Sequence, residues 1–303
     1  MKTLSTNKKV LSYIGIFFVV FIWGISPLVT YRLNHYYSPT FKVAVSSLIS
    51  LVTFLILSKN RIKEIDKTYI IPGVVTGLFL ALANISQKIG LLYTTPAKYA
   101  FLENLSLISV PVVMYLLTRK KPRFLTVISC VLCLLGVFVL NGIRFDGMWG
   151  IGELLCAISG LLYGFNIAGT ACYAKKLYAP LYLAIQSIVD FVIALIFALI
   201  LNAIPITDAS GSISVVEKIV FPMDFSLFTF LVVYVVIGSA ICWIIRTNCM
   251  KNISATVVSI IMPFSAVVTA VASVIAGTDT MSVNMMLGGL MIFIAIICSS
   301  FDN

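Results

Sequence analysis

Three polar side chains share one face of a segment that is otherwise apolar, and their chemistry is that of a binding surface. Asn84, Gln87 and Lys88 are spaced i, i+3 and i+4, so a helix places them on the same side. Two amides and one ammonium group offer both donors and acceptors to a polar solute. We predict that this face binds a small molecule.

Glu103 is the side chain with the most specific chemistry. It lies one turn after Tyr99 and directly before Asn104, again within an apolar segment. A charge in such a segment costs about 2.5 to 3.5 kcal/mol on insertion scales. Glu103 therefore binds a proton, holds the ammonium group of a solute, or pairs with Lys88 or Lys98 to fix helix packing. We predict that Tyr99, Glu103 and Asn104 bind the solute and that Glu103 couples to protons.

Asp190 is the second carboxylate inside an apolar segment. Gln186 precedes it by one helical turn. The same reasoning leaves two interpretations open, a proton site and a device for helix packing. We include Asp190 with Glu103 as a candidate proton-coupling residue.

Aromatic and polar residues in other apolar segments complete the predicted binding site. They are Trp23, Tyr163, Asn166, Trp243 and Arg246. Aromatic rings can stack on a flat solute or simply pack against neighbouring helices. Arg246 lies about one turn from the end of its segment, so its guanidinium either faces the site or reaches the membrane surface.

Catalytic chemistry finds no support in the sequence, and no catalytic residue is predicted. The single histidine, His35, follows the first apolar stretch, and there is no HExxH or P-loop motif. Cys130 and Cys133 form a CxxC inside an apolar segment, without a second pair or a nearby histidine, so we expect packing residues. The chain is therefore not expected to be an enzyme, to bind a metal or cofactor, or to use ATP.

Composition identifies lipid as the solvent of most of the chain. Of 303 residues, 60% are hydrophobic and 11% are charged, and the mean hydropathy is +1.09. Soluble domains carry roughly a quarter charged residues. The net charge of +10 comes from basic residues scattered beside the apolar stretches, which is typical of topology signals and excludes a nucleic-acid partner.

The apolar stretches predict an all-α integral membrane protein with ten transmembrane helices, since about 20 residues span a bilayer. Loops on one side carry fourteen Lys and Arg residues and loops on the other carry three. The positive-inside rule then places both termini in the cytoplasm of a multi-pass protein of the plasma membrane. The predicted spans cover residues 12–32, 40–58, 69–92, 97–117, 124–141, 149–172, 180–201, 226–248, 254–276 and 282–301.

The second half of the chain echoes the first. An aromatic-glycine pair recurs in "FIWGISP" and "LLYGFNI", and Pro39 and Pro180 each open the helix that follows. The sequence therefore predicts two five-helix repeats, residues 1–145 and 146–303. Because five is odd, the second repeat crosses the bilayer in the opposite direction, an arrangement typical of alternating-access transporters with a central site.

The chain resembles the drug/metabolite transporter superfamily, in its ten-span EamA-type branch. The resemblance is carried by the Trp-Gly pair of the first span, by "YTTPAKYAFLENLSLISVPV" and by "ISATVVSIIMPFSAVV". One departure is visible: the family often carries a basic residue near the position of Ser46, whereas here Lys42 lies four residues earlier. The resemblance implies a central cavity between the two halves, and it implies that the fifth and tenth spans serve packing or homodimer contacts.

These features predict a secondary active transporter, most plausibly an exporter, of a small polar or amphipathic metabolite such as an amino-acid-like zwitterion, with protons as the candidate coupling ion. One alternative is a drug-efflux permease or uniport facilitator for aromatic or cationic solutes. Another is a non-transporting membrane scaffold, which requires the polar faces to pair with one another and to leave no solvated cavity.

Overall fold

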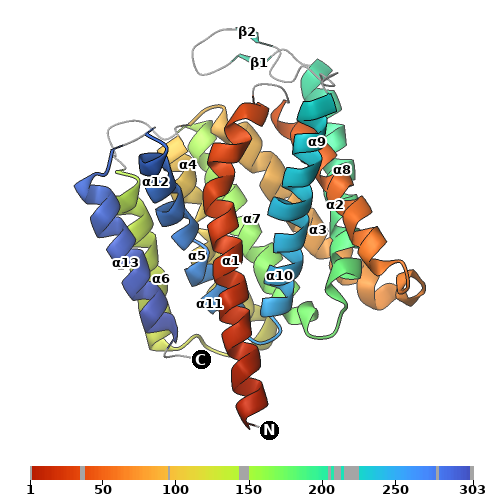
Figure 1. The fold of residues 1–303 in the computed structure, drawn as a ribbon. Helices are drawn as coiled ribbons and strands as arrows, with labels where there is room; N and C mark the ends of the chain where they lie inside the picture. The colour runs from red at the N-terminus through yellow and green to blue at the C-terminus, as the bar shows by residue number, and fades with distance from the viewer. Residues whose placement is uncertain are drawn as a thin grey trace.

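The computed structural model describes residues 2–34, 38–94, 96–142, 150–203, 206–207, 213–214, 225–277 and 280–300. These residues form a bundle of roughly aligned helices (Figure 1). His35 and much of the loop between residues 202 and 225 lie outside the described residues. The part of that loop that is described is a short antiparallel ladder between β1 (Ile206–Thr207) and β2 (Ile213–Ser214).

Seven of the predicted spans are continuous helices. They begin and end within a few residues of the predicted limits, except that the first helix extends ten residues further toward the N-terminus. They are α1 (Lys2–Asn34), α2 (Pro39–Ser58), α3 (Lys67–Leu91), α6 (Phe124–Leu140), α7 (Ile151–Ala174), α8 (Ala179–Ala203) and α13 (Val283–Ser300). A single 3-10 turn, Ile62–Glu64, lies between α2 and α3.

The other three predicted spans are interrupted. The fourth consists of α4 (Pro96–Glu103) and α5 (Ser106–Thr118), and the ninth of α11 (Ala255–Ile261) and α12 (Phe264–Ile275). The eighth consists of α9 (Phe225–Tyr234), a π-helical segment (Val235–Ile241) and α10 (Cys242–Cys249). Breaks within membrane helices leave backbone groups free and are tolerated where other protein groups surround them.

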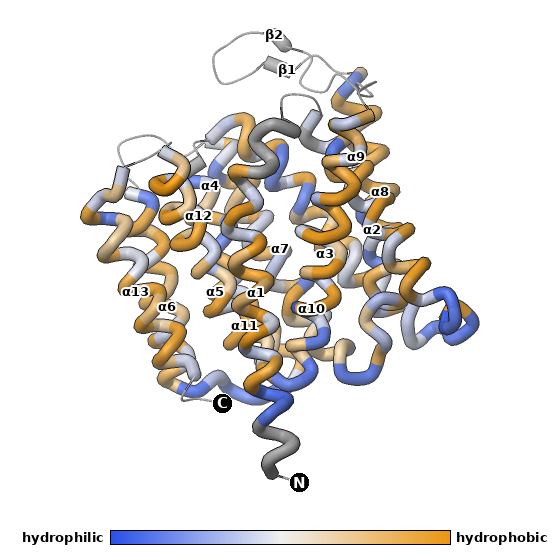
Figure 2. The backbone as a smooth tube through the Cα atoms, viewed as in Figure 1, coloured by the Kyte–Doolittle hydropathy of each residue, from blue (hydrophilic) through white to orange (hydrophobic). Residues whose placement is uncertain are grey.

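The length and apolarity of these helices define an all-helical membrane protein. Among the described residues, nine helical segments are long and apolar enough to cross a bilayer, and α6, with 17 residues, is a shorter apolar helix. Hydrophilic stretches gather mainly at the end of the bundle where α1 begins and α13 ends (Figure 2). The surface between the two ends is largely hydrophobic, as lipid contact requires.

The helices that carry the predicted polar site residues pack against one another. α2 packs along α8, α3 packs on both α7 and α8, and α1 packs on α10 and α12, while α4 and α5 lie along α7. α6 and α13 form a separate pair at one side of the bundle (Figure 1). The helices that carry the predicted site residues are therefore neighbours.

Glycine permits the closest of these contacts. A Cβ at Gly288 of α13 would meet the backbone of Gly136 and Leu140 of α6, and a Cβ at Gly164 of α7 would overlap Ser109 of α5. Small residues let membrane helices approach until their backbones touch. These positions hold α6 against α13 and α5 against α7.

Candidate functional site

Asp190 lies at the centre of a hydrogen-bond cluster that joins α2, α3, α7 and α8. Its carboxylate accepts from Ser47 Oγ at 2.5 Å and from Asn84 Nδ2 at 3.0 and 3.2 Å. Asn84 in turn accepts a hydrogen bond from the Tyr163 hydroxyl. Asp190 is buried, whereas Asn84 and Tyr163 are partly exposed. We refer to Ser47, Asn84, Tyr163 and Asp190 as the Asp190 cluster.

Glu103 is held by a second cluster, formed by α3 and α4. Gln87 Nε2 donates to Glu103 Oε1 at 2.9 Å and lies 2.5 Å from the hydroxyl oxygen of Tyr99. Glu103 is the last residue of α4, where the fourth span breaks, and its side chain is partly exposed. Lys88, also on α3, interacts electrostatically with both Glu103 and Asp190. Gln87, Tyr99 and Glu103 form the Glu103 cluster, and among the described residues Lys88 makes no ion pair within 4.0 Å with the carboxylate of either cluster.

Arg246 of α10 lies among aromatic rings. Its guanidinium carbon is 4.0 Å from the centroid of the Trp243 ring and 5.7 Å from that of Trp23 on α1, and the two rings are 5.9 Å apart. Arg246 Nη2 lies 3.4 Å from Asn166 Oδ1 on α7, a long hydrogen bond. Arg246 is 3% exposed. Trp23, Asn166, Trp243 and Arg246 form the Arg246 cluster.

The Arg246 cluster is fixed to its surroundings through backbone groups. Trp23 Nε1 donates to the Gly238 carbonyl in the π-helical segment at 2.9 Å, and Asn166 Nδ2 donates to the Thr76 carbonyl of α3 at 3.0 Å. The near-complete burial of Arg246 favours the interpretation in which its guanidinium faces the interior of the bundle. The enclosing indole rings and Asn166 keep the guanidinium inside the bundle.

Ten of the eleven predicted binding residues lie in or beside these three clusters, and Asn104 does not. Its side-chain amide donates to the Ala100 carbonyl of its own helix at 2.7 Å. The amide thereby pairs with a carbonyl next to the break between α4 and α5. Asn104 shapes the end of α4 and does not join the Glu103 cluster.

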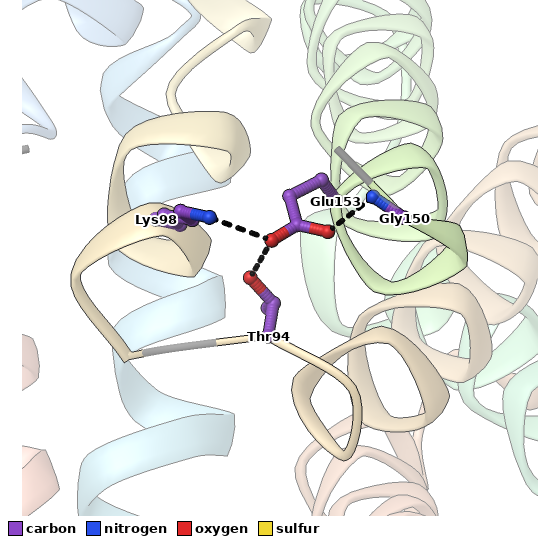
Figure 3. Close-up of polar contacts among 4 residues, drawn as sticks. All are labelled: Thr94, Lys98, Gly150 and Glu153. Carbon is purple, nitrogen blue, oxygen red and sulfur yellow. Dashed lines mark hydrogen bonds and ion pairs between the residues drawn. The ribbon is translucent and has the colours of Figure 1, made fainter. Parts of the chain in front are cut away.

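Lys98 pairs with Glu153 and not with Glu103, a partner that the sequence reasoning missed (Figure 3). Glu153 accepts from Lys98 Nζ at 3.2 Å, from Thr94 Oγ1 at 2.9 Å and from the backbone N–H of Gly150 at 2.9 Å. We name Thr94, Lys98, Gly150 and Glu153 the Glu153 cluster. It ties the first turn of α4 to the first turn of α7.

Glu153 is buried, although it lies in the first turn of α7. The residue is only 5% exposed. Glu153 lies three residues after Gly150, the N-cap of α7, and accepts from the Gly150 backbone N–H, which is one half of a capping box. The sequence does not show that Lys98 lies across the helix interface from Glu153.

A buried polar cluster beneath these groups was also missed. Gln186 Nε2 lies within hydrogen-bond distance of Thr76, Thr170 and Tyr182, at 2.7, 3.3 and 3.1 Å. Its residues belong to α3, α7 and α8, and Gln186 lies one helical turn before Asp190 on α8. Its four residues are buried, so it acts as an interhelical hydrogen-bond core.

A cavity of about 450 Å³ lies elsewhere, between α5 and α6. It is lined by apolar side chains such as Leu107, Val112, Cys130 and Leu134. None of the three polar clusters contributes to its lining. This cavity offers no group that could orient a polar solute.

The fold and the buried polar clusters define a multi-pass, all-helical membrane protein with several charged groups inside the bundle. Residues 10–142 match the EamA-like transporter family, part of the drug/metabolite transporter superfamily, so this part of the chain is an EamA-like transporter domain. Such a domain implies membrane transport of a small molecule, and members of the family are typically not enzymes.

Among solved structures, a crystal structure of a protein resembles the whole chain with a TM-score of 0.75 and 16% sequence identity, covering 96% of each chain. At that identity the likeness shows the fold alone. No curated protein matches the chain.

Proposed function

We propose that this protein is a secondary active transporter, working as an exporter, of a small polar or amphipathic metabolite such as an amino-acid-like zwitterion. It lies in the plasma membrane with both termini in the cytoplasm. The observation that carries the proposal is the set of charged groups from α3, α4, α8 and α10, of which Asp190 and Arg246 are buried, and three of which are bonded to amides on neighbouring helices. Charges inside a membrane bundle are retained where they serve a substrate or ion path.

Two inverted repeats, residues 1–145 and 146–303, would supply the motion. The breaks at residues 104–105 and 262–263 fall at corresponding points of the fourth and ninth spans, which supports this part of the proposal. Helix contacts correspond as well: α4 and α5 pack on α7 as α11 and α12 pack on α1, and α3 packs on α7 as α10 packs on α1. Discontinuous helices near the centre of inverted repeats are typical of transporter sites.

Glu103 and Asp190 are the proposed proton-coupling residues. Both carboxylates act on the single Lys88, so at most one of them can have that ammonium group as its full counter-charge. Glu103 also ends α4, and the C-terminal end of a helix disfavours an anion. A carboxylate in this position is suited to bind and release a proton as the solute or Lys88 moves.

The alternatives fit the clusters less well. A permease for aromatic cations would use the indole faces of Trp23 and Trp243, but Arg246 lies over Trp243 and would repel a cation. A non-transporting scaffold requires the polar faces to pair with one another, whereas Arg246 Nε, Thr247 Oγ1 and Gln186 Oε1 have no hydrogen-bond partner among the described residues. Unpaired buried donors and acceptors favour a site that binds something.

Flux into proteoliposomes tests the proposal. A panel of radiolabelled metabolites is presented with and without a pH gradient to wild type, Glu103→Gln, Asp190→Asn and the control Glu64→Gln, whose carboxylate is exposed. With one coupled proton, a gradient of one pH unit supplies about 1.4 kcal/mol, or roughly tenfold accumulation of a neutral solute. We expect Glu103→Gln to lose this accumulation and to keep solute exchange.

Transport and proton coupling can each be refuted separately. If wild type moves no solute of the panel above empty liposomes, the transport proposal fails. If Glu103→Gln and Asp190→Asn both accumulate solute with the pH dependence of wild type, coupling through these carboxylates is wrong while transport stands.

A further inference from the structure

We propose that Arg246 is the binding site for a carboxylate group and that the transported solute must carry one. The proposal starts from an unpaired buried charge. Arg246 is 3% exposed, and no described residue accepts a hydrogen bond from its Nε–H. No carboxylate lies within ion-pair distance of it among the described residues.

The charges around Arg246 confirm that its counter-charge is missing from the described chain. Glu103 and Asp190 both act on Lys88, and Lys98 pairs with Glu153. The titratable groups that act on Arg246 are the phenols of Tyr163 and Tyr182, which are neutral at physiological pH. A buried guanidinium without an anion is costly, and it is retained where a ligand supplies the anion.

The neighbours of Arg246 orient it without neutralising it. The Trp243 ring lies against the guanidinium at 4.0 Å, Trp23 flanks it at 5.7 Å, and Asn166 accepts weakly from Nη2 at 3.4 Å. The unpaired Nε–H and the weakly used Nη2 form one edge of the guanidinium. That edge presents two parallel donors, the arrangement that matches the two oxygens of a carboxylate.

Charge balance favours a carboxylate over a phosphate. A carboxylate carries one negative charge and neutralises the single guanidinium. A phosphate monoester carries close to two charges at neutral pH and would leave an uncompensated charge in a medium of low dielectric. The indole rings beside the guanidinium suit the apolar body of an amphipathic acid.

Binding to the purified full-length protein in detergent tests the site without relying on flux. Two of the chain's three tryptophans lie beside Arg246, so their fluorescence reports occupancy. The probes are acetate, benzoate and 3-phenylpropionate, each titrated against its own amide, with phenyl phosphate as the phosphate probe. Fluorescence and the unfolding temperature are both followed.

The variants are Arg246→Gln, Arg246→Lys and a control, Lys120→Gln, which removes an exposed cation near the membrane surface. We expect saturable responses to the carboxylates and not to the amides in wild type and in Lys120→Gln. Arg246→Gln should weaken carboxylate binding by about tenfold or more, and Arg246→Lys should keep part of the preference. Without ligand, Arg246→Gln should unfold at the same temperature as wild type or higher, because an unpaired charge is gone.

Four results would overturn the proposal. Equal responses to acids and amides in wild type, including no response to either, refute a carboxylate site, as does a preference that survives in Arg246→Gln. A lower unfolding temperature for ligand-free Arg246→Gln with unchanged binding would make Arg246 a packing residue for Trp23 and Trp243. Stronger binding of phenyl phosphate than of benzoate refutes the choice of carboxylate.

Assigning this carboxylate to a transported solute rests on the proposed transport function, but the binding test does not. Specific binding without flux would refute transport and leave the site standing. Flux of solutes that lack any acid group, equal in wild type and Arg246→Gln, would refute the inference and leave transport standing.

Discussion

Replacing Glu153 by Gln should loosen the contact between the first turns of α4 and α7. The carboxylate accepts from Lys98, Thr94 and Gly150, and glutamine retains the shape but not the charge. Hydrogen bonds to charged groups contribute about 1.5 to 3 kcal/mol each. Lys98 has 21% of its side chain exposed and can turn to water, so part of the loss is recovered.

The net effect on this contact is therefore about 2 kcal/mol, or roughly a 30-fold increase in the open population. Hydrogen-deuterium exchange of the full-length protein measures it, because amides that exchange through a rapid local opening do so in proportion to the open population. We expect exchange in Pro96–Glu103 and in the first turn of Ile151–Ala174 to accelerate together. Lys98→Met should accelerate α4 similarly while leaving the Gly150 cap in place.

The control is Glu64→Gln, which removes a carboxylate from the exposed pair between Arg61 and Glu64. Exposed pairs of this kind contribute about 0 to 1 kcal/mol, so exchange in α4 and α7 should stay as in wild type. Two results would refute the reasoning. Unchanged exchange in both helices of Glu153→Gln means that the cluster does not hold them, and acceleration of α7 alone means that only its N-terminal cap was lost.

Two further predictions concern the remaining close contacts. Ser47→Ala removes the 2.5 Å hydrogen bond to Asp190 and should lower the unfolding temperature in detergent by an amount equivalent to about 1 to 2 kcal/mol. Ser46→Ala, at the adjacent position, should change the unfolding temperature little. Equal effects of the two substitutions would mean that the bond to Asp190 does not stabilise the protein. Gly288→Ala places a Cβ against the backbone of α6 and should lower the free energy of unfolding by about 1 to 3 kcal/mol. In Gly289→Ala the Cβ meets only the Val267 side chain, at 3.4 Å, so its stability should be close to that of wild type. Thermal unfolding of the two variants, measured side by side, tests this difference.

Apolar length alone was enough to predict the membrane class and most of the helix limits, but it could not reveal where helices break. A break inside lipid changes neither the hydropathy nor its period, so only local chemistry signals it. Pro263 is such a signal in the ninth span, and the structure places the break there. In the fourth span the proline is Pro111, yet that helix continues through Pro111 and breaks at residues 104–105.

The sequence predicted which residues share a helix face, but it could not predict which residues on other helices they contact. The spacing of Gln87 with Lys88, and of Tyr99 with Glu103, is local and survives in the Glu103 cluster. The bond from Ser47 to Asp190 joins residues 143 positions apart, and it depends on how α2 packs on α8. Whether a charged residue within a span is paired, as Glu153 is, or lacks an ion-pair partner among the described residues, as Arg246 does, follows from packing across helices. The candidate residues were therefore within reach of sequence reasoning and their pairings were not.

Two corresponding helix contacts, α4 with α7 and the turn after α10 with α1, differ in strength. At one end the Glu153 cluster ties the start of α4 to α7 through the ion pair with Lys98 and a hydrogen bond from Thr94, both to a buried carboxylate. At the corresponding contact of the other repeat, the turn after α10 meets α1 through a neutral bond from Asn252 Nδ2 to Ser12 Oγ, at 2.9 Å. A neutral bond contributes about 0.5 to 1.5 kcal/mol, less than the cluster of charged bonds. If the repeats rock against each other as proposed, the end near the start of α1 opens more readily, and the ligand-free protein should favour the conformation that is open on that side.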